Sequence, residues 1–331
     1  MYPKKTIAVG VILVFLIIGL VAACVLPVNS LKVSSKGFEK SYNYPYSRLF
    51  VPTQIKKINN YYFIVDSNHH RIIFSDNLDS SIEDWTPIDY EFAGPHSISS
   101  NGEIYVVDNT GRNEVLVFDS KFKKIQTISN VGLRPHKVLF DRGKFYVLSS
   151  QTQEIYCYST KKDMLVEEYH RKLPFLEDSY VRSIKIIGNN MYFIANNNTV
   201  FITNYLSTNY EVINKYKMPS EFVEMVDVEL FNGNYFVSAM GTPESGIRSQ
   251  LVKGSSLRNI ENGIYTDVYT ESNMVGKPYL FEEIDNKLFF TEIGEVSNGV
   301  LSVDKNNMYS VHYRFNNILP ESWERRAMYP L

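Results

Sequence analysis

One short strand motif recurs six times along the chain, and this repetition constrains the fold more than any other feature of the sequence. Each copy follows a cluster of turn-forming residues and is rich in Tyr, Phe, Val and Ile, whose side chains favour a pleated strand. The copies are Tyr61–Asp66, Glu103–Asp108, Lys144–Ser149, Asn190–Ala195, Asn234–Ala239 and Lys287–Glu292. Their last residues lie 42, 41, 46, 44 and 53 positions apart. A period of roughly 45 residues with several short strands per period is typical of propeller blades.

Further strands can be aligned on either side of this motif. Counting back twelve or thirteen residues from the end of each copy reaches the start of a preceding strand, where four of the six units carry Pro. Third strands are expected at 71–74, 115–118, 155–158, 200–203, 250–253 and 299–303, and fourth strands in five units at 124–128, 165–169, 212–216, 264–269 and 308–314. The sequence therefore predicts an all-β domain over residues 46–319, a six-bladed β-propeller of four-stranded antiparallel blades, followed by a tail at 320–331.

The second unit also contains a turn signal. Asn101-Gly102 lies between two apolar runs, and this dipeptide favours a two-residue type I′ hairpin turn, in which both central residues have positive φ. We therefore expect a tight hairpin at Asn101-Gly102.

The N-terminal segment has the composition of a membrane helix. Residues 7–28 contain no charged side chain, and Lys4 and Lys5 precede them. A run of this length can cross the hydrocarbon core once, with the basic end in the cytoplasm. Residues 1–30 are thus predicted to be an uncleaved anchor or a lipoprotein signal cleaved before Cys24, with ordinary cleavage as a third possibility, and residues 31–45 a tether. Each outcome places residues 31–331 outside the cytoplasm, at the cell surface or on the secretory side.

Charge and cysteine content narrow the class of protein. The formal net charge is −2, and no run of Lys or Arg is present. Nucleic acid is therefore not expected as a partner, because phosphate binding needs clustered basic residues. The second of the two cysteines, Cys157, is expected to be unpaired and buried on a strand, because Cys24 belongs to the membrane segment.

The candidate site lies where the innermost strands begin, because side chains there point into the central channel of a propeller. The residues at this position are Thr53, His96, His136, Arg182, Asp227 and Tyr279. His96 and His136 occupy neighbouring blades and could bind a divalent metal, or each could cap its own strand. Arg182 suits a carboxylate or phosphate, or an ion pair with Asp227. Tyr279 could act as a general acid or base, stack on a sugar, or simply pack.

Two units carry a recognisable pattern. Residues 95–118 and 135–158 follow Pro-x-x-[Ile/Val], turn, [Tyr/Phe]-Val, turn and a third apolar run, which resembles the NHL and YVTN-type propeller repeats. That resemblance implies the six-bladed fold, and the group includes protein-binding modules, sugar-lactone hydrolases and an amidating lyase. Pro95-His96-Ser97 is also similar to a motif of the peptidyl-hydroxyglycine amidating lyases, which hold zinc with channel histidines. Arg182 stands where a third histidine would be expected. The lactonase-like propellers use channel carboxylates, of which Asp227 is the only match.

Two hypotheses of function follow. The first is a membrane-anchored extracytoplasmic propeller that binds a small-molecule, glycan or protein ligand at its channel face without chemistry. The second is a metal-dependent lyase or hydrolase, with a divalent metal on His96 and His136, and with Arg182, Asp227 and Tyr279 acting on the substrate. Two imidazoles more than roughly 5 Å apart could not share one ion, because Zn–N bonds are about 2.1 Å long.

Overall fold

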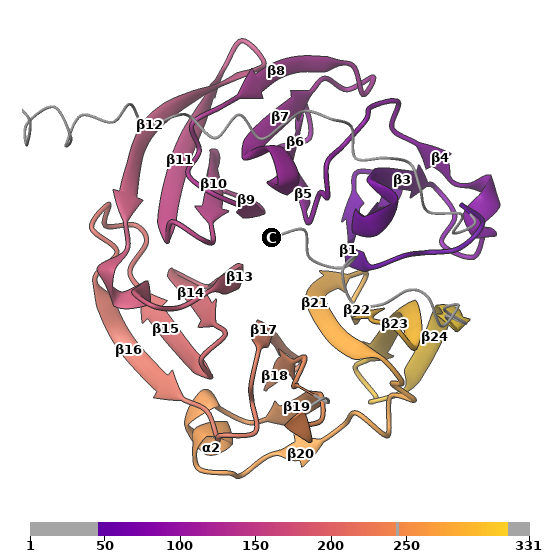
Figure 1. Cartoon of the computed structure of the whole chain (residues 1–331), viewed down its shortest axis with the longest axis vertical. Helices are drawn as coiled ribbons and strands as arrows, with labels where there is room; N and C mark the ends of the chain where they lie inside the picture. The colour runs from indigo at the N-terminus through magenta and orange to yellow at the C-terminus, as the bar shows by residue number, and fades with distance from the viewer. Residues whose placement is uncertain (1–45, 243–244, 317–331) are drawn as a thin grey trace, which may run out of the picture. The chain divides into compact units, whose positions relative to one another are not determined.

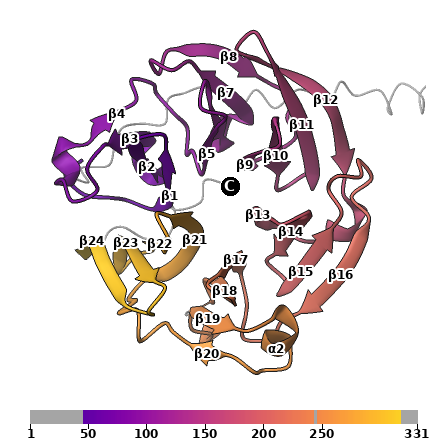
Figure 2. The same ribbon diagram turned by 180° about the vertical axis from the view of Figure 1, so that it is seen from behind.

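In the computed structural model the described residues are 46–242 and 245–316. They form six four-stranded antiparallel sheets, arranged as blades around a common centre (Figure 1). Figure 2 shows the same ring from behind, with β1, β5, β9, β13, β17 and β21 nearest the centre. The predicted six-bladed β-propeller is therefore confirmed. The predicted membrane helix, tether and C-terminal tail lie outside the described residues, and within those residues no helix is long and apolar enough to cross a membrane.

Each blade is one continuous segment of chain whose strands run outward from the centre in sequence order. Blade one contains β1 (Pro52–Ile58), β2 (Tyr61–Asp66), β3 (Arg71–Ser75) and β4 (Thr86–Pro87), and blade two β5 (Ile98–Ser100), β6 (Tyr105–Asn109), β7 (Glu114–Phe118) and β8 (Lys124–Ile128). Blade three contains β9 (Pro135–Asp141), β10 (Lys144–Ser149), β11 (Glu154–Lys161) and β12 (Met164–Lys172), and blade four β13 (Val181–Ile187), β14 (Asn190–Ala195), β15 (Thr199–Thr203) and β16 (Val212–Lys217). Blade five contains β17 (Met225–Phe231), β18 (Asn234–Ala239), β19 (Gln250–Gly254) and β20 (Thr266–Asp267), and blade six β21 (Lys277–Ile284), β22 (Lys287–Ile293), β23 (Ser297–Asp304) and β24 (Tyr309–Asn316).

The helical elements are short and connect strands. They are η1 (Ser67–His69), η2 (Ile82–Asp84), η3 (Thr110–Arg112), η4 (Pro174–Leu176) and the single-turn helix α2 (Leu257–Glu261). Ser256 caps α2, because its side chain accepts a hydrogen bond from the Asn259 amide.

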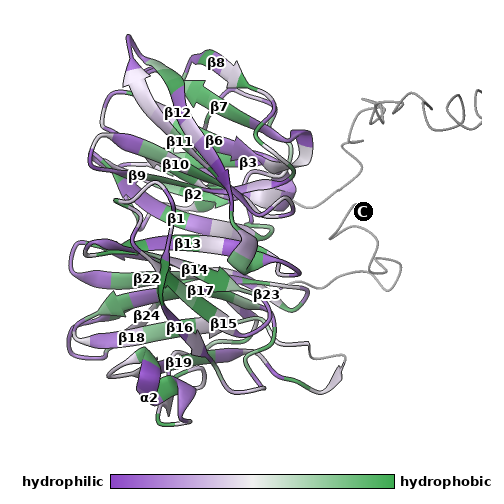
Figure 3. Ribbon diagram, turned by 90° about the vertical axis from the view of Figure 1, so that its left-hand side faces the viewer, coloured by the Kyte–Doolittle hydropathy of each residue, from purple (hydrophilic) through white to green (hydrophobic). Residues whose placement is uncertain are grey.

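The core consists of apolar layers between neighbouring blades. The layer between blades one and two contains Phe63 and Leu116, and the layer between blades six and one contains Ile64 and Phe289, all of them buried. Four similar clusters fill the other interfaces. Figure 3 shows that both hydrophobic and hydrophilic residues occur along the strands of the stacked sheets. Cys157 lies buried and unpaired in β11, as predicted.

The predicted hairpin at Asn101-Gly102 is present, but the prediction of a two-residue type I′ turn is wrong. Ser100 pairs with Tyr105, so four residues connect β5 to β6, and only Gly102 has positive φ, at 94°. The Asn101 side chain instead accepts hydrogen bonds from the amides of Glu103 and Ile104, each at 3.0 Å.

Type I′ geometry occurs in other blades. Positive φ at both central residues is found at Arg142-Gly143, with φ of 48° and 78°, and at Asn232-Gly233, with φ of 48° and 75°. These turns join the first two strands of blades three and five, which is where Asn101-Gly102 stands in blade two.

Candidate functional site

A one-residue irregularity in the innermost strands presents side chains at the channel entrance. In β9, Pro135 pairs with Ser149 and Lys137 with Leu148, so His136 is the extra residue of a β-bulge. Thr53 and Arg182 occupy the same position in β1 and β13, and the register also shifts around Tyr279 in β21. His96 lies just before β5, which begins at Ile98.

Blade five departs from the predicted alignment by one residue. The bulge of β17 lies between Met225 and Asp227, so Val226 is the extra residue, and Asp227 pairs with Ser238 in the regular ladder. The entrance ring defined by the structure is therefore Thr53, His96, His136, Arg182, Val226 and Tyr279.

His96 and His136 are in contact. Their ring centroids are 4.0 Å apart and their planes are inclined by 33°. This spacing is within the range required of two imidazoles that share a ligand. The His136 ring also meets the Tyr180 ring edge to face at 5.8 Å, which holds the pair against blade four.

Hydrogen bonds fix the tautomer of His96. Its Nδ1 lies 2.9 Å from the Thr110 hydroxyl, which in turn reaches the Asp108 carboxylate at 2.8 Å and the Pro135 carbonyl at 2.6 Å. Because Thr110 has a single hydroxyl hydrogen and donates it to one of these oxygens, the hydroxyl accepts from His96. The Nδ1 atom of His96 thus carries the proton.

His136 adopts the same tautomer. Its Nδ1 lies 2.9 Å from the backbone carbonyl of Arg182, and a carbonyl can only accept. Each neutral imidazole therefore keeps its lone pair on Nε2. The hydrogen bonds found for both rings within the described residues use Nδ1, which leaves Nε2 as the atom that can accept from a ligand.

Both histidines are held neutral. Burial, together with the nearby charges of Arg134 and Arg182, lowers the pKa of His96 to about 3. Burial, His96 and Arg182 lower the pKa of His136 well below its usual value. Burial raises the pKa of Asp108 to about 6, although hydrogen bonds from Ser97 and from the His96 amide oppose this shift. At neutral pH the pair is thus two uncharged acceptors beside cationic groups.

Arg182 forms an ion pair, but not with the expected partner. Its Nη1 lies 2.6 Å from Glu224 Oε2, and its guanidinium lies 5.0 Å from the centre of the Tyr180 ring. The predicted pair with Asp227 is not formed; Asp227 instead accepts from the Ser183 hydroxyl at 2.8 Å and lies 3.3 Å from Lys185 Nζ.

Tyr279 and Asp227 belong to a separate, buried group. The Asp227 amide donates to Ser238 Oγ at 3.1 Å, and the Ser238 hydroxyl donates to the Tyr279 carbonyl at 2.9 Å. Tyr279 is 3% exposed and packs in an apolar cluster that includes Val226 and Met240. Of the predicted site residues, the structure brings together His96, His136 and Arg182, whereas the contacts of Asp227 and Tyr279 join blade five to its neighbours.

The sequence interpretation missed a layer of charges deeper in the channel. The innermost strands bring together six charged side chains, namely Lys56, Lys137, Lys185, Asp227, Glu229 and Glu282. Lys185 Nζ lies 2.9 Å from Glu229, and Lys56 pairs with Glu282 across the junction of blades one and six. Lys137 is fully buried, and its Nζ has no hydrogen-bond partner within the described residues. The available signal was a charged residue inside the innermost strand of a blade, such as Lys185 and Glu229, each the fifth residue of its strand.

A resident metal ion does not fit the described residues. Among residues 46–242 and 245–316, no three His, Cys, Asp or Glu side chains lie close enough to hold one ion. The histidine pair would supply two ligands, whereas protein zinc sites use at least three. The adjacent Arg182 guanidinium further disfavours a cation at this place.

Comparisons with known proteins support the fold. No family model and no curated protein matches the chain. Among solved structures, a putative 6-phosphogluconolactonase from Bacteroides fragilis is 13% identical over 80% of this chain and 84% of that chain, with a TM-score of 0.56. A catalytically inactive variant of virginiamycin B lyase from Staphylococcus aureus, with quinupristin, is 16% identical over 82% of this chain and 85% of that chain, with a TM-score of 0.54.

A third similar chain comes from the mitotic checkpoint complex, 11% identical over 82% of this chain and 80% of that chain, with a TM-score of 0.52. Likeness at these identities shows a β-propeller fold shared by proteins with different names and does not assign an activity. Membership of the NHL group stays a resemblance of the sequence.

Proposed function

We propose that the protein is a binding propeller that holds a small polar ligand at its channel entrance without chemistry. The observation that carries this proposal is the histidine pair. His96 and His136 stack 4.0 Å apart, each uses Nδ1 for a fixed hydrogen bond to the protein, and each leaves Nε2 open. Convergent polar atoms on a rigid scaffold are the usual form of a ligand site.

The electrostatics of the entrance favour a particular ligand chemistry. Two neutral Nε2 atoms accept hydrogen bonds, so the ligand presents donors such as hydroxyl groups. Arg134 and Arg182 lie near enough to lower the pKa of both imidazoles, and guanidinium groups bind carboxylates and phosphates. A hydroxylated anion, such as a sugar acid or a sugar phosphate, meets both requirements.

A calorimetric titration tests the proposal. Sugar acids and sugar phosphates are titrated into the full chain and into the His96→Ala, His136→Ala double variant. Loss of two hydrogen-bond acceptors is expected to weaken binding roughly 10- to 100-fold. His170→Ala is the matched control, because His170 lies exposed on β12 and pairs with Glu167. Binding that survives in the double variant, or no binding by any member of the panel, would contradict the proposal.

A metal-dependent lyase or hydrolase is the second candidate. The observation that favours it is the fixed Nδ1–H of both histidines, since metal-binding imidazoles commonly donate their other nitrogen to a protein oxygen. The absence of a third protein ligand among the described residues counts against it. Elemental analysis of the purified chain decides: a stoichiometric transition metal that the double variant lacks would establish this candidate, and a metal-free protein would remove it.

We further propose that residues 1–30 attach the chain to a membrane and that the propeller lies outside the cytoplasm. The support is the uncharged run at 7–28 behind Lys4 and Lys5. Alkaline extraction of membranes and protease digestion of intact cells test this placement. Release of the chain at high pH, or protection from external protease, would contradict it. Cys24→Ser distinguishes a lipoprotein, which loses its lipid, from an uncleaved anchor, which is unaffected.

A further inference from the structure

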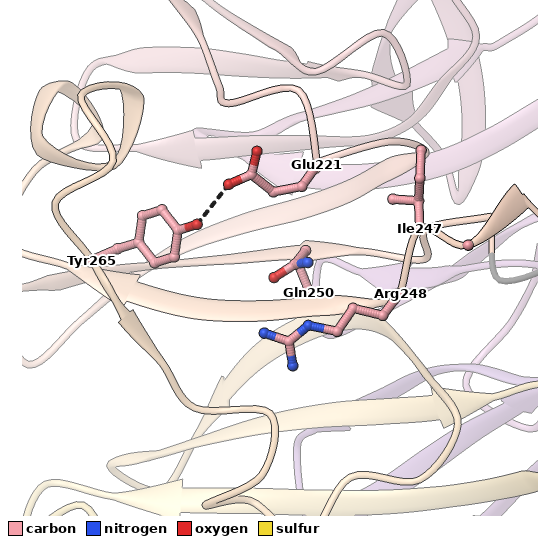
Figure 4. Close-up of a pocket in the computed structure, with 6 residues that line it drawn as sticks. Glu221, Ile247, Arg248, Gln250 and Tyr265 are labelled. Carbon is pink, nitrogen blue, oxygen red and sulfur yellow. Dashed lines mark hydrogen bonds between the residues drawn. The ribbon is translucent and has the colours of Figure 1, made fainter.

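A second polar pocket lies on blade five, away from the histidine pair of blades two and three. It is an open pocket of about 490 Å³, and its volume is within the range of about 300 to 1,000 Å³ typical of ligand sites. Its lining residues come from the loop before β17, the loop before β19, β19 itself and the segment before β20; they are Glu221, Gly246, Ile247, Arg248, Gln250 and Tyr265. Figure 4 shows their side chains around the pocket.

Gln250 is the unusual member of this group. It is the first residue of β19, opposite Ala239, and it is only 5% exposed. Its side-chain amide makes no hydrogen bond within the described residues, and it opens onto the pocket. This amide offers two N–H donors and one carbonyl acceptor to a ligand that enters the pocket.

Opposite charges flank this amide. The Tyr265 hydroxyl donates to Glu221 at 2.8 Å, and Tyr265 is held by the edge of the Phe222 ring, whose centroid is 5.4 Å away. This bond leaves the Glu221 carboxylate with capacity to accept more hydrogen bonds. On the other side of Gln250, Figure 4 shows the guanidinium of Arg248.

Arg248 keeps donors available. Its Nη2 pairs with Asp267 at 2.5 Å, but the arginine side chain is 63% exposed, and an exposed pair of this kind is weak. The planar guanidinium has five N–H donors, so it can bind a second carboxylate. The pair with Asp267 directs the Arg248 side chain to β20, the outermost strand of the blade.

We propose that this pocket binds a short peptide with free ends. The order carboxylate, amide and guanidinium, given by Glu221, Gln250 and Arg248, matches the order ammonium, peptide amide and carboxylate in a zwitterionic dipeptide. Gln250 pairs with the peptide group through one donor and one acceptor, and Ile247 lies beside an apolar side chain of the peptide.

Calorimetry of the full chain with the dipeptide Ala-Ala tests the inference. Three analogues remove one feature each: N-acetyl-Ala-Ala lacks the ammonium group, Ala-Ala-amide lacks the carboxylate, and free alanine lacks the peptide group. Each analogue is expected to bind roughly tenfold more weakly or worse. Equal affinity for all four compounds, or no binding of Ala-Ala at millimolar concentration, overturns the inference.

Variants locate the binding to this pocket. Gln250→Leu and Arg248→Gln should each weaken Ala-Ala binding roughly tenfold or more. Arg248 is exposed, so its variant remains decisive even if replacement of buried Gln250 prevents folding. The His96→Ala, His136→Ala variant should bind Ala-Ala normally, because its residues lie in other blades, and this result separates the pocket from the proposed function of the channel entrance. Unchanged binding in Arg248→Gln would refute the inference.

Discussion

The two halves of the entrance ring differ in what their side chains contact. The polar arc, formed by Thr53, His96, His136 and Arg182, belongs to blades one to four, whereas the apolar arc, formed by Val226 and Tyr279, belongs to blades five and six. The side chains of the apolar arc pack against buried neighbours such as Leu280 and Ile293. The polar arc keeps two open nitrogen atoms.

This difference shows why one strand position has two uses. The same β-bulge occurs in several blades, so the backbone directs the side chains of Thr53, His136, Arg182 and Val226 to the channel entrance. Where the residue is apolar, it adds to the contacts that hold blades together. Where it is His, the hydrogen bond of Nδ1 orients the ring and leaves Nε2 for a ligand. Four predictions test this division, beginning with the largest expected effect.

Tyr279→Ala is expected to destabilise the fold by about 4 kcal/mol, because it removes a buried ring from the apolar arc. Urea unfolding measures this loss. The control Tyr279→Phe keeps the ring and should retain both stability and binding at the histidine pair. If Tyr279→Phe folds normally but loses the ligand, the phenol takes part in the site, and the division between the arcs is wrong.

Glu282→Gln, in the charged layer below both arcs, is expected to cost about 3 kcal/mol, because it leaves Lys56 without its partner. Gln54 also donates to this carboxylate, at 3.3 Å. Asp285→Asn is the matched control; its pair with Lys57 joins the same two blades at 2.5 Å, but Asp285 is 57% exposed, and no measurable change is expected.

The pH dependence of this layer has a defined sign. Burial would raise the pKa of Glu282, but Lys56, Lys185 and Lys137 together lower it to about 2 from the usual 4.5. The stabilising charge is therefore fully present above pH 4.5 and is lost as the pH falls towards 2. Equal losses of unfolding free energy in Glu282→Gln and Asp285→Asn would show that burial of the ion pair in the channel does not increase its contribution to stability.

His96→Gln is expected to flatten the acid side of the stability profile. The pKa of His96 is lowered from 6.5 to about 3, so between these values the unfolded chain binds a proton that the folded protein does not. The free energy of unfolding of the wild-type protein should therefore decrease as the pH is lowered through this window. This group contributes up to about 1.4 kcal/mol per pH unit.

Urea unfolding at several pH values measures the slope, with His170→Gln as the exposed control. Asp108, whose pKa is raised to about 6, acts in the opposite direction, but it is present in both proteins being compared. If the slope of stability against pH is the same in His96→Gln as in the wild-type protein, His96 is protonated as easily in the folded state as in the unfolded state, and it is not a neutral acceptor.

Lys137→Met should stabilise the protein by about 1 kcal/mol at pH 7, because it replaces a buried ammonium that has no hydrogen-bond partner among the described residues. Burial and Lys185 lower the pKa of Lys137 to about 8 from 10.5. Wild-type stability should thus rise between these values, and the advantage of the variant should shrink. Lys56→Met, which removes a paired lysine, should instead destabilise. Thermal unfolding of the three proteins at pH 7 and pH 10 tests both expectations. A lower stability of Lys137→Met than of the wild-type protein at pH 7 would show that the Lys137 ammonium group is stabilised by its surroundings.

Much of the fold could be predicted because the second strand of each blade is buried on both faces. Tyr61–Asp66 and Asn190–Ala195 are the observed bounds of β2 and β14. The strand β4 was missed because it has only two residues, Thr86 and Pro87, and no alternation marks it. Outer strands pair on one side only, so their sequences are less constrained.

The site was less predictable than the fold, for two physical reasons. A β-bulge adds a residue that no periodicity reveals, so counting along the chain assigned the channel position of blade five to Asp227 and not to Val226. Ion-pair partners are chosen in three dimensions, and Arg182 pairs with Glu224, which lies just before the strand that supplied the expected partner. The proximity of His96 and His136 was predictable, because both stand at the same position of adjacent blades.

The continuity of each blade has a mechanical consequence. Because no blade combines strands from both ends of the chain, the ring has one seam, where Val51 donates to Asn298 at 3.0 Å and Arg48 reaches the carbonyl of Asn316 at 3.5 Å. The two ends of the described chain therefore leave the ring side by side. A pulling force applied to these two ends acts on the seam before it acts on any strand. A circular permutant, in which the two ends are joined and the chain is opened between two other blades, would move the seam to that place and keep every contact within the sheets.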